Sequence, residues 1–126
     1  MKEIDSLKKE LIKIKEIFAI VLYGSYANNK QNIRSDIDLC LVLKTNEKEK
    51  IKKVYQKTLI LSGKSEKYDI KIFESLPLKI KFEVISEGKV LYAKNKQELQ
   101  EYFYFFRKLW KDQSINWLEK KHLITA

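Results

Sequence analysis

The sequence predicts an α/β fold, and the spacing of its apolar residues is the basis for this prediction. Four short apolar runs have the length and composition of buried strands, and segments with apolar residues every three or four positions separate them. Only three glycines and one proline interrupt the 126 residues, so the chain is expected to form one compact domain, 1–126. Helices alternating with strands favour a sheet covered by helices on at least one face.

The first half of the chain is expected to contain two helices and two strands. An amphipathic helix is predicted over residues 3–16, followed by one strand within FAIVLYGS and another over 36–44. A second helix is predicted over 47–61, where apolar positions recur among lysines, and Gly63 provides its C-terminal stop.

The next part of the chain is expected to add two strands and the helix that joins them. YDIKIFE and KVLYAK alternate as strands do. LPLKIKFEVISEG alternates as well, but Ser75 can cap a helix, Pro77 fits a first turn and Gly88 can end it. This stretch is therefore predicted to be helical.

An aromatic C-terminal helix is predicted at 96–112. Asn95 with Glu98 three residues later is typical of a capping box. An apolar stripe follows at helical spacing, formed by Leu99, Tyr102, Phe103, Phe106 and Trp110. Tyr104 and Phe105 fall outside this stripe, which indicates a second contact with a partner or another copy of the chain. A further short helix is expected around Trp117.

Charge and composition limit the classes of function. The net charge of +9 comes from 24 lysines and two arginines against 17 acids, and lysines mixed with glutamates favour a solvated surface over a nucleic-acid-binding one. The N-terminus has no apolar run of signal-peptide or membrane-span length, so a cytoplasmic protein is expected. Cys40 is expected to be a small core residue, and a single histidine, His122, leaves no material for a zinc site.

Two aspartates at the start of the second predicted strand are the first candidates for chemistry. Residues i and i+2 of a strand point to the same side, so Asp36 and Asp38 are expected to project together. Adjacent carboxylates repel each other unless a proton or a cation lies between them. Mg²⁺ takes oxygen ligands of this kind, so the pair predicts a metal site. The alternative for Asp36 is a simple turn acid after Ser35.

A third carboxylate, Asp69, lies in YDIKIFE among apolar residues that face the other way. If this strand pairs beside 36–44, three aspartates meet at one edge of the sheet. Such a site can hold two metal ions, which suits phosphoryl displacement. The sequence alone does not identify the neighbour of this strand.

Gly24 and Ser25 follow the first predicted strand. A glycine there lets the backbone approach a ligand closely, and the amides of the next turn favour an anion such as phosphate. A lone Gly-Ser is usually only a tight turn. Ten residues separate Ser25 from Asp36, with a strand on each side, and this combination favours a phosphate-binding turn.

These residues carry a family resemblance. GSYANNKQNIRSDIDLCLV, residues 24–42, resembles the GSx10DxD signature of the nucleotidyltransferase superfamily typified by DNA polymerase beta. YDIKIF, SEGKVLYAK and the chain length resemble its minimal nucleotidyltransferase (MNT) branch. The resemblance covers the chain from about Phe18 to the C-terminal helix. It implies a single domain, 1–126, with a mixed β-sheet of about four to five strands flanked by helices, the nucleotidyltransferase (polymerase beta-like) fold.

The resemblance also implies a reaction and a partner. ATP with two Mg²⁺ ions would supply AMP to a tyrosine hydroxyl on a HEPN-type toxin encoded nearby, and the chain would act as the antitoxin. By position, Gly24 and Ser25 would hold the triphosphate. Asp36, Asp38 and Asp69 would bind metal, and Asp69 could take the hydroxyl proton. Asn28-Asn29 replaces the usual Arg-Gly of the family, a departure that concerns the rate of the reaction rather than the fold.

Three other functions remain open from the sequence. The chain could be a non-catalytic antitoxin that only binds its partner. It could be a small-molecule nucleotidyltransferase, although it lacks the further acidic domain that a cationic drug would require. It could be a basic nucleic-acid binder, but no aromatic-basic platform is evident, and direct nucleic-acid binding is not expected. A homo- or hetero-oligomer is compatible with each hypothesis.

Overall fold

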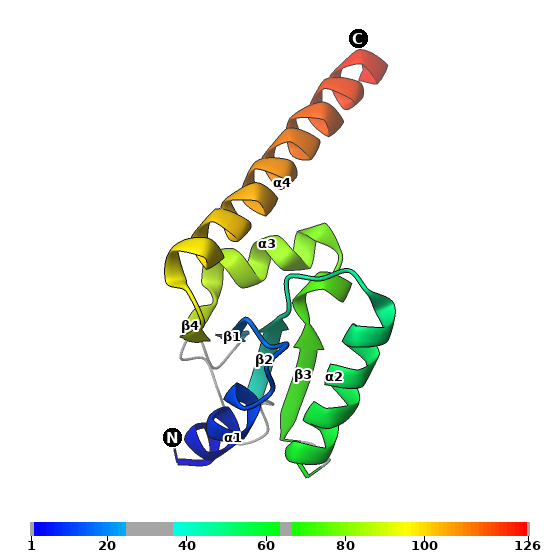
Figure 1. Cartoon of the computed structure of the whole chain (residues 1–126). Helices are drawn as coiled ribbons and strands as arrows, with labels where there is room; N and C mark the ends of the chain where they lie inside the picture. The colour runs from blue at the N-terminus through cyan, green and yellow to red at the C-terminus, as the bar shows by residue number, and fades with distance from the viewer. Residues whose placement is uncertain (1, 25–36, 64–66, 126) are drawn as a thin grey trace.

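The computed structural model describes residues 2–24, 37–63 and 67–125, and their side chains from residue 4 to residue 113 (Figure 1). A four-stranded mixed sheet lies at its centre, in the order β3-β2-β1-β4. β1 runs antiparallel to both β2 and β4, whereas β2 and β3 are parallel. The predicted α/β fold with a mixed sheet is confirmed. The strands are β1 Ala19–Tyr23, β2 Ile37–Val42, β3 Tyr68–Ile72 and β4 Lys89–Ala93.

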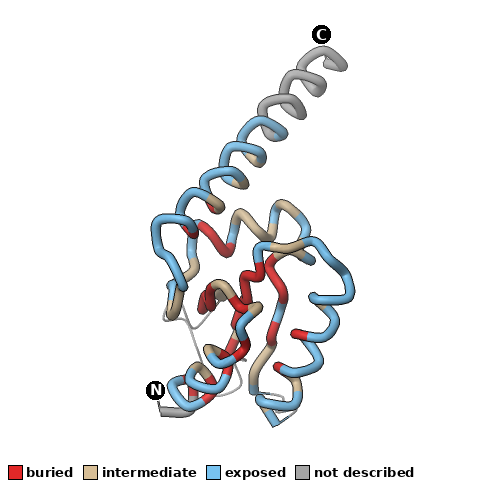
Figure 2. Tube along the Cα trace, viewed as in Figure 1, coloured by how far each residue is buried: buried red, intermediate tan, exposed pale blue. Residues whose placement is uncertain are grey.

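Helices cover both faces of the sheet. α1 (Lys2–Ile12) and α2 (Lys48–Leu61) pack with one buried cluster, and α3 (Leu78–Glu87) and α4 (Lys96–Thr125) pack with a second cluster on the other face. Buried residues concentrate in the strands between these layers (Figure 2). The second half of α4 runs away from the sheet (Figure 1).

β2 shows how the sequence places side chains on two faces. Leu39 and Leu41 belong to the cluster with α1 and α2, whereas Cys40 and Val42 belong to the cluster with α3 and α4. Cys40 is completely buried, as predicted, and burial raises the pKa of its thiol. By the same alternation, Asp38 lies on the face of α3 and α4.

Two predicted helices have different boundaries. α1 ends at Ile12 rather than residue 16, because the chain tightens into turns in which Lys13 N–H donates to Glu10 O and Ile14 N–H to Leu11 O. α4 continues to Thr125 rather than ending at 112 before a separate short helix around Trp117. Neither glycine nor proline occurs after residue 95, so nothing in the sequence breaks this helix.

The starts of the last two helices differ in how well they match the prediction. α3 is helical and ends at Gly88, as expected, but Pro77 is its N-cap residue and Ser75 lies in a preceding 3₁₀ turn, Phe73–Ser75. Ser75 therefore does not cap α3. The predicted cap of α4 is confirmed, because the Asn95 side-chain oxygen accepts the Glu98 N–H at 3.0 Å.

Glu74 joins three parts of the fold. Its carboxylate accepts the backbone N–H groups of Leu43 and Lys44 at 3.0 and 2.9 Å, and the Tyr102 hydroxyl at 2.7 Å. Burial, together with the hydrogen bond to Glu74, raises the pKa of the Tyr102 phenol, so the phenol remains a donor. The base of α4 is thereby attached to the end of β2.

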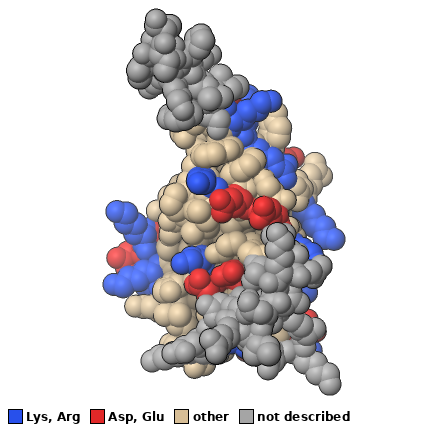
Figure 3. Space-filling model, turned by 180° about the vertical axis from the view of Figure 1, so that it is seen from behind, with Lys and Arg blue, Asp and Glu red and all other residues tan. Residues whose placement is uncertain are grey.

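The surface agrees with the interpretation of the lysines as solvating groups. On the face that Figure 3 shows, acidic side chains lie between basic ones, and no single basic field is visible among the described residues. No helix in the described part of the chain has the length and apolarity required to cross a membrane.

Gly88 is expected to be the glycine most sensitive to substitution for stability. A Cβ there would lie 2.4 Å from Val21 Cγ1 and 2.4 Å from the Val84 carbonyl oxygen. Gly88→Ala should lower the free energy of unfolding by about 1–3 kcal/mol, because the Val84 backbone cannot move aside to make room for the added methyl group. Urea denaturation checks this, with the exposed Ser86→Ala as the control. Equal stability of the two variants would contradict the close packing at Gly88.

Candidate active site

Two of the predicted aspartates are direct neighbours in the sheet. β2 and β3 pair in parallel register, and Asp38 is the partner of Asp69. The strand over 68–72 therefore lies beside β2, which the sequence could not establish. Ile37 and Leu39 flank Asp38, and Ile70 follows Asp69, and all three belong to the cluster on the opposite face. The two carboxylates consequently project together on the face of α3 and α4.

The two carboxylates differ in their surroundings. Asp38 is half-buried at the start of β2. The Asp69 side chain is 43% exposed, and its Oδ1 lies 3.8 Å from Lys71 Nζ. An ion pair as exposed as this one is weak and easily exchanged for another cation. Asp69 is accordingly accessible from solvent, whereas Asp38 forms the inner part of the site.

Gly24 at the end of β1 completes the described part of the site. It has a φ of +75°, in the left-handed region that favours glycine. A Cβ at this position would lie 2.3 Å from Asp38 Oδ2. The backbone and the carboxylate therefore approach so closely that only glycine fits. The Asp38 side chain therefore lies close to Gly24, where the sequence predicts a turn that binds phosphate.

Tyr23 is a site residue that the sequence analysis did not single out. It pairs with Asp38 across β1 and β2, so Tyr23, Asp38 and Asp69 form one row over three strands. Burial raises the pKa of the Tyr23 phenol, and Cys40, Asp38 and Asp69 raise it further. The phenol stays protonated and can act as a donor beside the carboxylates. Its signal in the sequence was its place directly before Gly24.

Ser25 and Asp36 lie outside the described residues, so the structure does not test their predicted roles. Within the described ranges, no group of three His, Cys, Asp or Glu side chains is close enough to hold a metal ion. The described acidic part of the site is the pair Asp38 and Asp69. The three-carboxylate metal site remains a prediction.

The donor chemistry of this pair fits a hard divalent cation. Carboxylates paired directly across two strands repel each other, and a cation removes this cost. Their oxygens are the ligand type that Mg²⁺ prefers. The exposure of Asp69 leaves room for further ligands from solvent or substrate.

Comparison with known proteins identifies the family. Residues 5–97 match the family model "Polymerase beta, Nucleotidyltransferase", which includes β1, β2, β3 and the row of Tyr23, Asp38 and Asp69. The chain belongs to the polymerase beta nucleotidyltransferase family. The resemblance inferred from residues 24–42 is confirmed at this level.

A curated relative of this nucleotidyltransferase comes from Methanocaldococcus jannaschii. It bears the name "Putative protein adenylyltransferase MJ1547" and is 48% identical over 99 residues. The alignment covers 77% of this chain and 72% of the relative.

Solved structures share the fold of this nucleotidyltransferase. A crystal structure of a toxin-antitoxin with AMP-PNP superposes with a TM-score of 0.71 at 20% identity, covering 99% of this chain and 98% of the other. A tri-AMPylated Shewanella oneidensis HEPN toxin in complex with MNT antitoxin gives a TM-score of 0.65 at 18% identity, covering 98% and 99%. At such identities the likeness establishes the fold alone.

Proposed function

We propose that this nucleotidyltransferase transfers AMP from ATP to a tyrosine hydroxyl of a partner HEPN-type toxin and thereby acts as an antitoxin. The observation that carries the proposal is the Asp38–Asp69 pair, held against Gly24 on one face of the sheet. The name of the curated relative supports a protein as acceptor. The AMPylated HEPN toxin in a neighbour of the same fold supports the class of partner.

The proposed reaction is an in-line phosphoryl displacement. The tyrosine oxygen of the acceptor attacks the α-phosphorus of ATP, the bond from that phosphorus to the bridging oxygen breaks, and pyrophosphate leaves. The proton of the tyrosine hydroxyl passes to the Asp69 carboxylate, which is 43% exposed and can be reached by a side chain from another protein. Gly24 and Ser25 bind the triphosphate through the turn after β1.

Asp36, Asp38 and Asp69 would hold two Mg²⁺ ions, which when bound would neutralise the charge of the phosphates. The chain's own contribution is to orient the carboxylates. Asp38 lies against Gly24 and is paired with Asp69, and the protonated phenol of Tyr23 lies in the same row of residues. Asn28-Asn29 supplies no positive charge to the triphosphate, so the metal ions, with Lys30 or Arg34, would provide it.

The acceptor protein would dock on α4. Tyr104 and Phe105 are 63% and 59% exposed on this helix, outside its packed stripe, as the sequence predicted. Single exposed aromatics are ordinary, but two adjacent ones on a helix that extends beyond the sheet offer a contact surface (Figure 1). The single domain, 1–126, would bring the catalytic residues, and the partner would complete the pocket around its own tyrosine.

Mass spectrometry tests this function. The purified protein is incubated with ATP, Mg²⁺ and the product of a neighbouring gene that encodes a HEPN-type protein. The neighbour should gain about 329 Da per unit, the mass of AMP minus water. Adding EDTA in excess of Mg²⁺ should stop the reaction. A tight complex with no gain of mass under any nucleotide would instead favour an antitoxin that acts by binding alone.

A further inference from the structure

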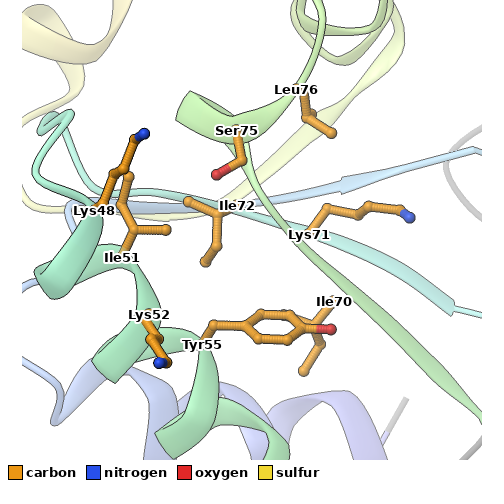
Figure 4. Close-up of a pocket in the computed structure, with 9 residues that line it drawn as sticks. All are labelled: Lys48, Ile51, Lys52, Tyr55, Ile70, Lys71, Ile72, Ser75 and Leu76. Atoms are coloured by element: carbon orange, nitrogen blue, oxygen red, sulfur yellow. The ribbon is translucent and has the colours of Figure 1, made fainter.

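A groove of about 490 Å³ lies between α2, β3 and the segment that follows β3, and neither Asp38 nor Asp69 lines it (Figure 4). Its walls are apolar, with Ile51 of α2 facing Ile70 and Ile72 of β3. Those two β3 side chains belong to the cluster with α1 and α2. The groove therefore opens on the side of β3 opposite to the carboxylates.

The groove has a basic rim and an aromatic side. Lys48, Lys52 and Lys71 line it, and none of the described acidic residues does. Lys48 and Lys52 make no ion pair with another described residue. Lys71 does, because its Nζ lies 3.8 Å from Asp69 Oδ1. In Figure 4, Lys48 lies near Ser75 at one end, Lys52 lies beside Tyr55 at the other, and Lys71 extends away on the far side. The lysines thus surround the groove without converging on one point.

The groove runs beside an open edge of the sheet. β3 is an edge strand, with β2 on one side and no described strand on the other. An edge strand carries backbone N–H and C=O groups that can pair with an added strand. Tyr55, 39% exposed, lies over the apolar wall and adds contact area for a side chain.

We propose that this groove binds an extended segment of another protein in which acidic and apolar side chains alternate. The segment would lie along the groove beside β3. Its apolar side chains, on one side of the extended backbone, would enter between Ile51 and Ile72, and its acidic side chains, on the other side, would point out to the rim and meet the lysines. This inference goes beyond the transfer of AMP and does not depend on which protein accepts it.

The shape of the groove favours a peptide over other anions. A single phosphate is held by several donors that converge on it, and these lysines stand apart. A single-stranded nucleic acid binds through a series of aromatic platforms, whereas this groove offers one tyrosine among branched aliphatic side chains. Acidic and apolar groups in alternation complement both the rim and the walls.

Fluorescence anisotropy with a labelled peptide of about eight residues, alternating Asp and Val, tests the proposal. The intact protein should bind it, and Lys48→Glu with Lys52→Glu should weaken binding by about tenfold or more. Lys53→Glu with Lys57→Glu is the matched control. This pair also lies four residues apart on α2 and makes the same change in net charge, but neither residue lines the groove.

Three results would overturn the proposal. The first is equal loss of binding in the control pair, which would indicate general charge attraction. The second is equal binding of a peptide that alternates Lys and Val. The third is displacement of the acidic peptide by an oligouridylate at lower concentration than by the unlabelled peptide, which would make the groove a nucleic-acid site. Tyr55→Ala, which should also weaken binding while leaving AMP transfer unchanged, separates this site from the carboxylates.

Discussion

Asp38→Asn is expected to abolish AMP transfer, with a loss of about 1,000-fold, while the fold is retained. Asn has the shape of Asp but lacks its charge, so the site loses half of the described carboxylate pair. Asp38 and Asp69 are direct partners across two strands, and removing one like charge relieves the repulsion between them, so the protein should still fold cooperatively. Product formation by mass spectrometry and thermal melting of the same samples measure the two effects.

The control for this variant is Asp5→Asn, which removes an exposed carboxylate on α1, far along the chain from the row of site residues. It makes the same change in net charge and should leave transfer unchanged. If Asp38→Asn kept more than about a tenth of the activity, the carboxylate pair would not be the catalytic centre.

Gly24→Ala is expected to remove nucleotide binding and transfer although it adds only one methyl group. The new Cβ would lie 2.3 Å from Asp38 Oδ2, so the carboxylate must move away from the turn after β1. The left-handed backbone, with a φ of +75°, adds strain of about 1–2 kcal/mol for a non-glycine residue. Calorimetry with ATP and Mg²⁺ measures the binding, and urea denaturation measures the strain.

The chain contains a matched control for the backbone strain. Gly63 also has a positive φ, +69°, but nothing lies within 4 Å of the position of a Cβ there. Gly63→Ala should therefore lose similar stability and keep full nucleotide binding. ATP affinity that is the same in both variants would show that the contact between Gly24 and Asp38 has no part in binding.

Most of the fold could be predicted because strands and helices differ in the period of their apolar residues. For α3 the period is that of a strand, and Pro77 and Gly88 indicated the helix instead. Ile70 and Ile72 alternate around Lys71, and this pattern indicated β3 before its neighbour was known.

The end of α1 could not be predicted in the same way. Ile14 and Ile17 are buried and continue the apolar spacing, but they lie in turns beyond the helix. Burial selects apolar residues in turns and in helices alike.

The site could be predicted only in part for a similar reason. The sequence indicated Asp38 and Asp69 by their charge within apolar strands, but their distance depends on strand order, which no local pattern contains. Tyr23 was missed because a tyrosine at the end of an apolar strand is ordinary, and only the pairing of β1 with β2 places it in the row. The contact of Gly24 with Asp38 likewise exists only in three dimensions.

Because β2 is buried on both faces, its register with the neighbouring strands determines whether Asp38 lies beside Asp69. A slip of one residue between β2 and its neighbours would turn Asp38 into the cluster of α1 and α2, and Leu39 out of it. An isolated carboxylate in that apolar cluster costs several kcal/mol, a large share of the stability of a small domain. A chain with the wrong register therefore does not persist as a folded but inactive species. A molecule that folds with the register of β2 and β3 therefore has Asp38 beside Asp69.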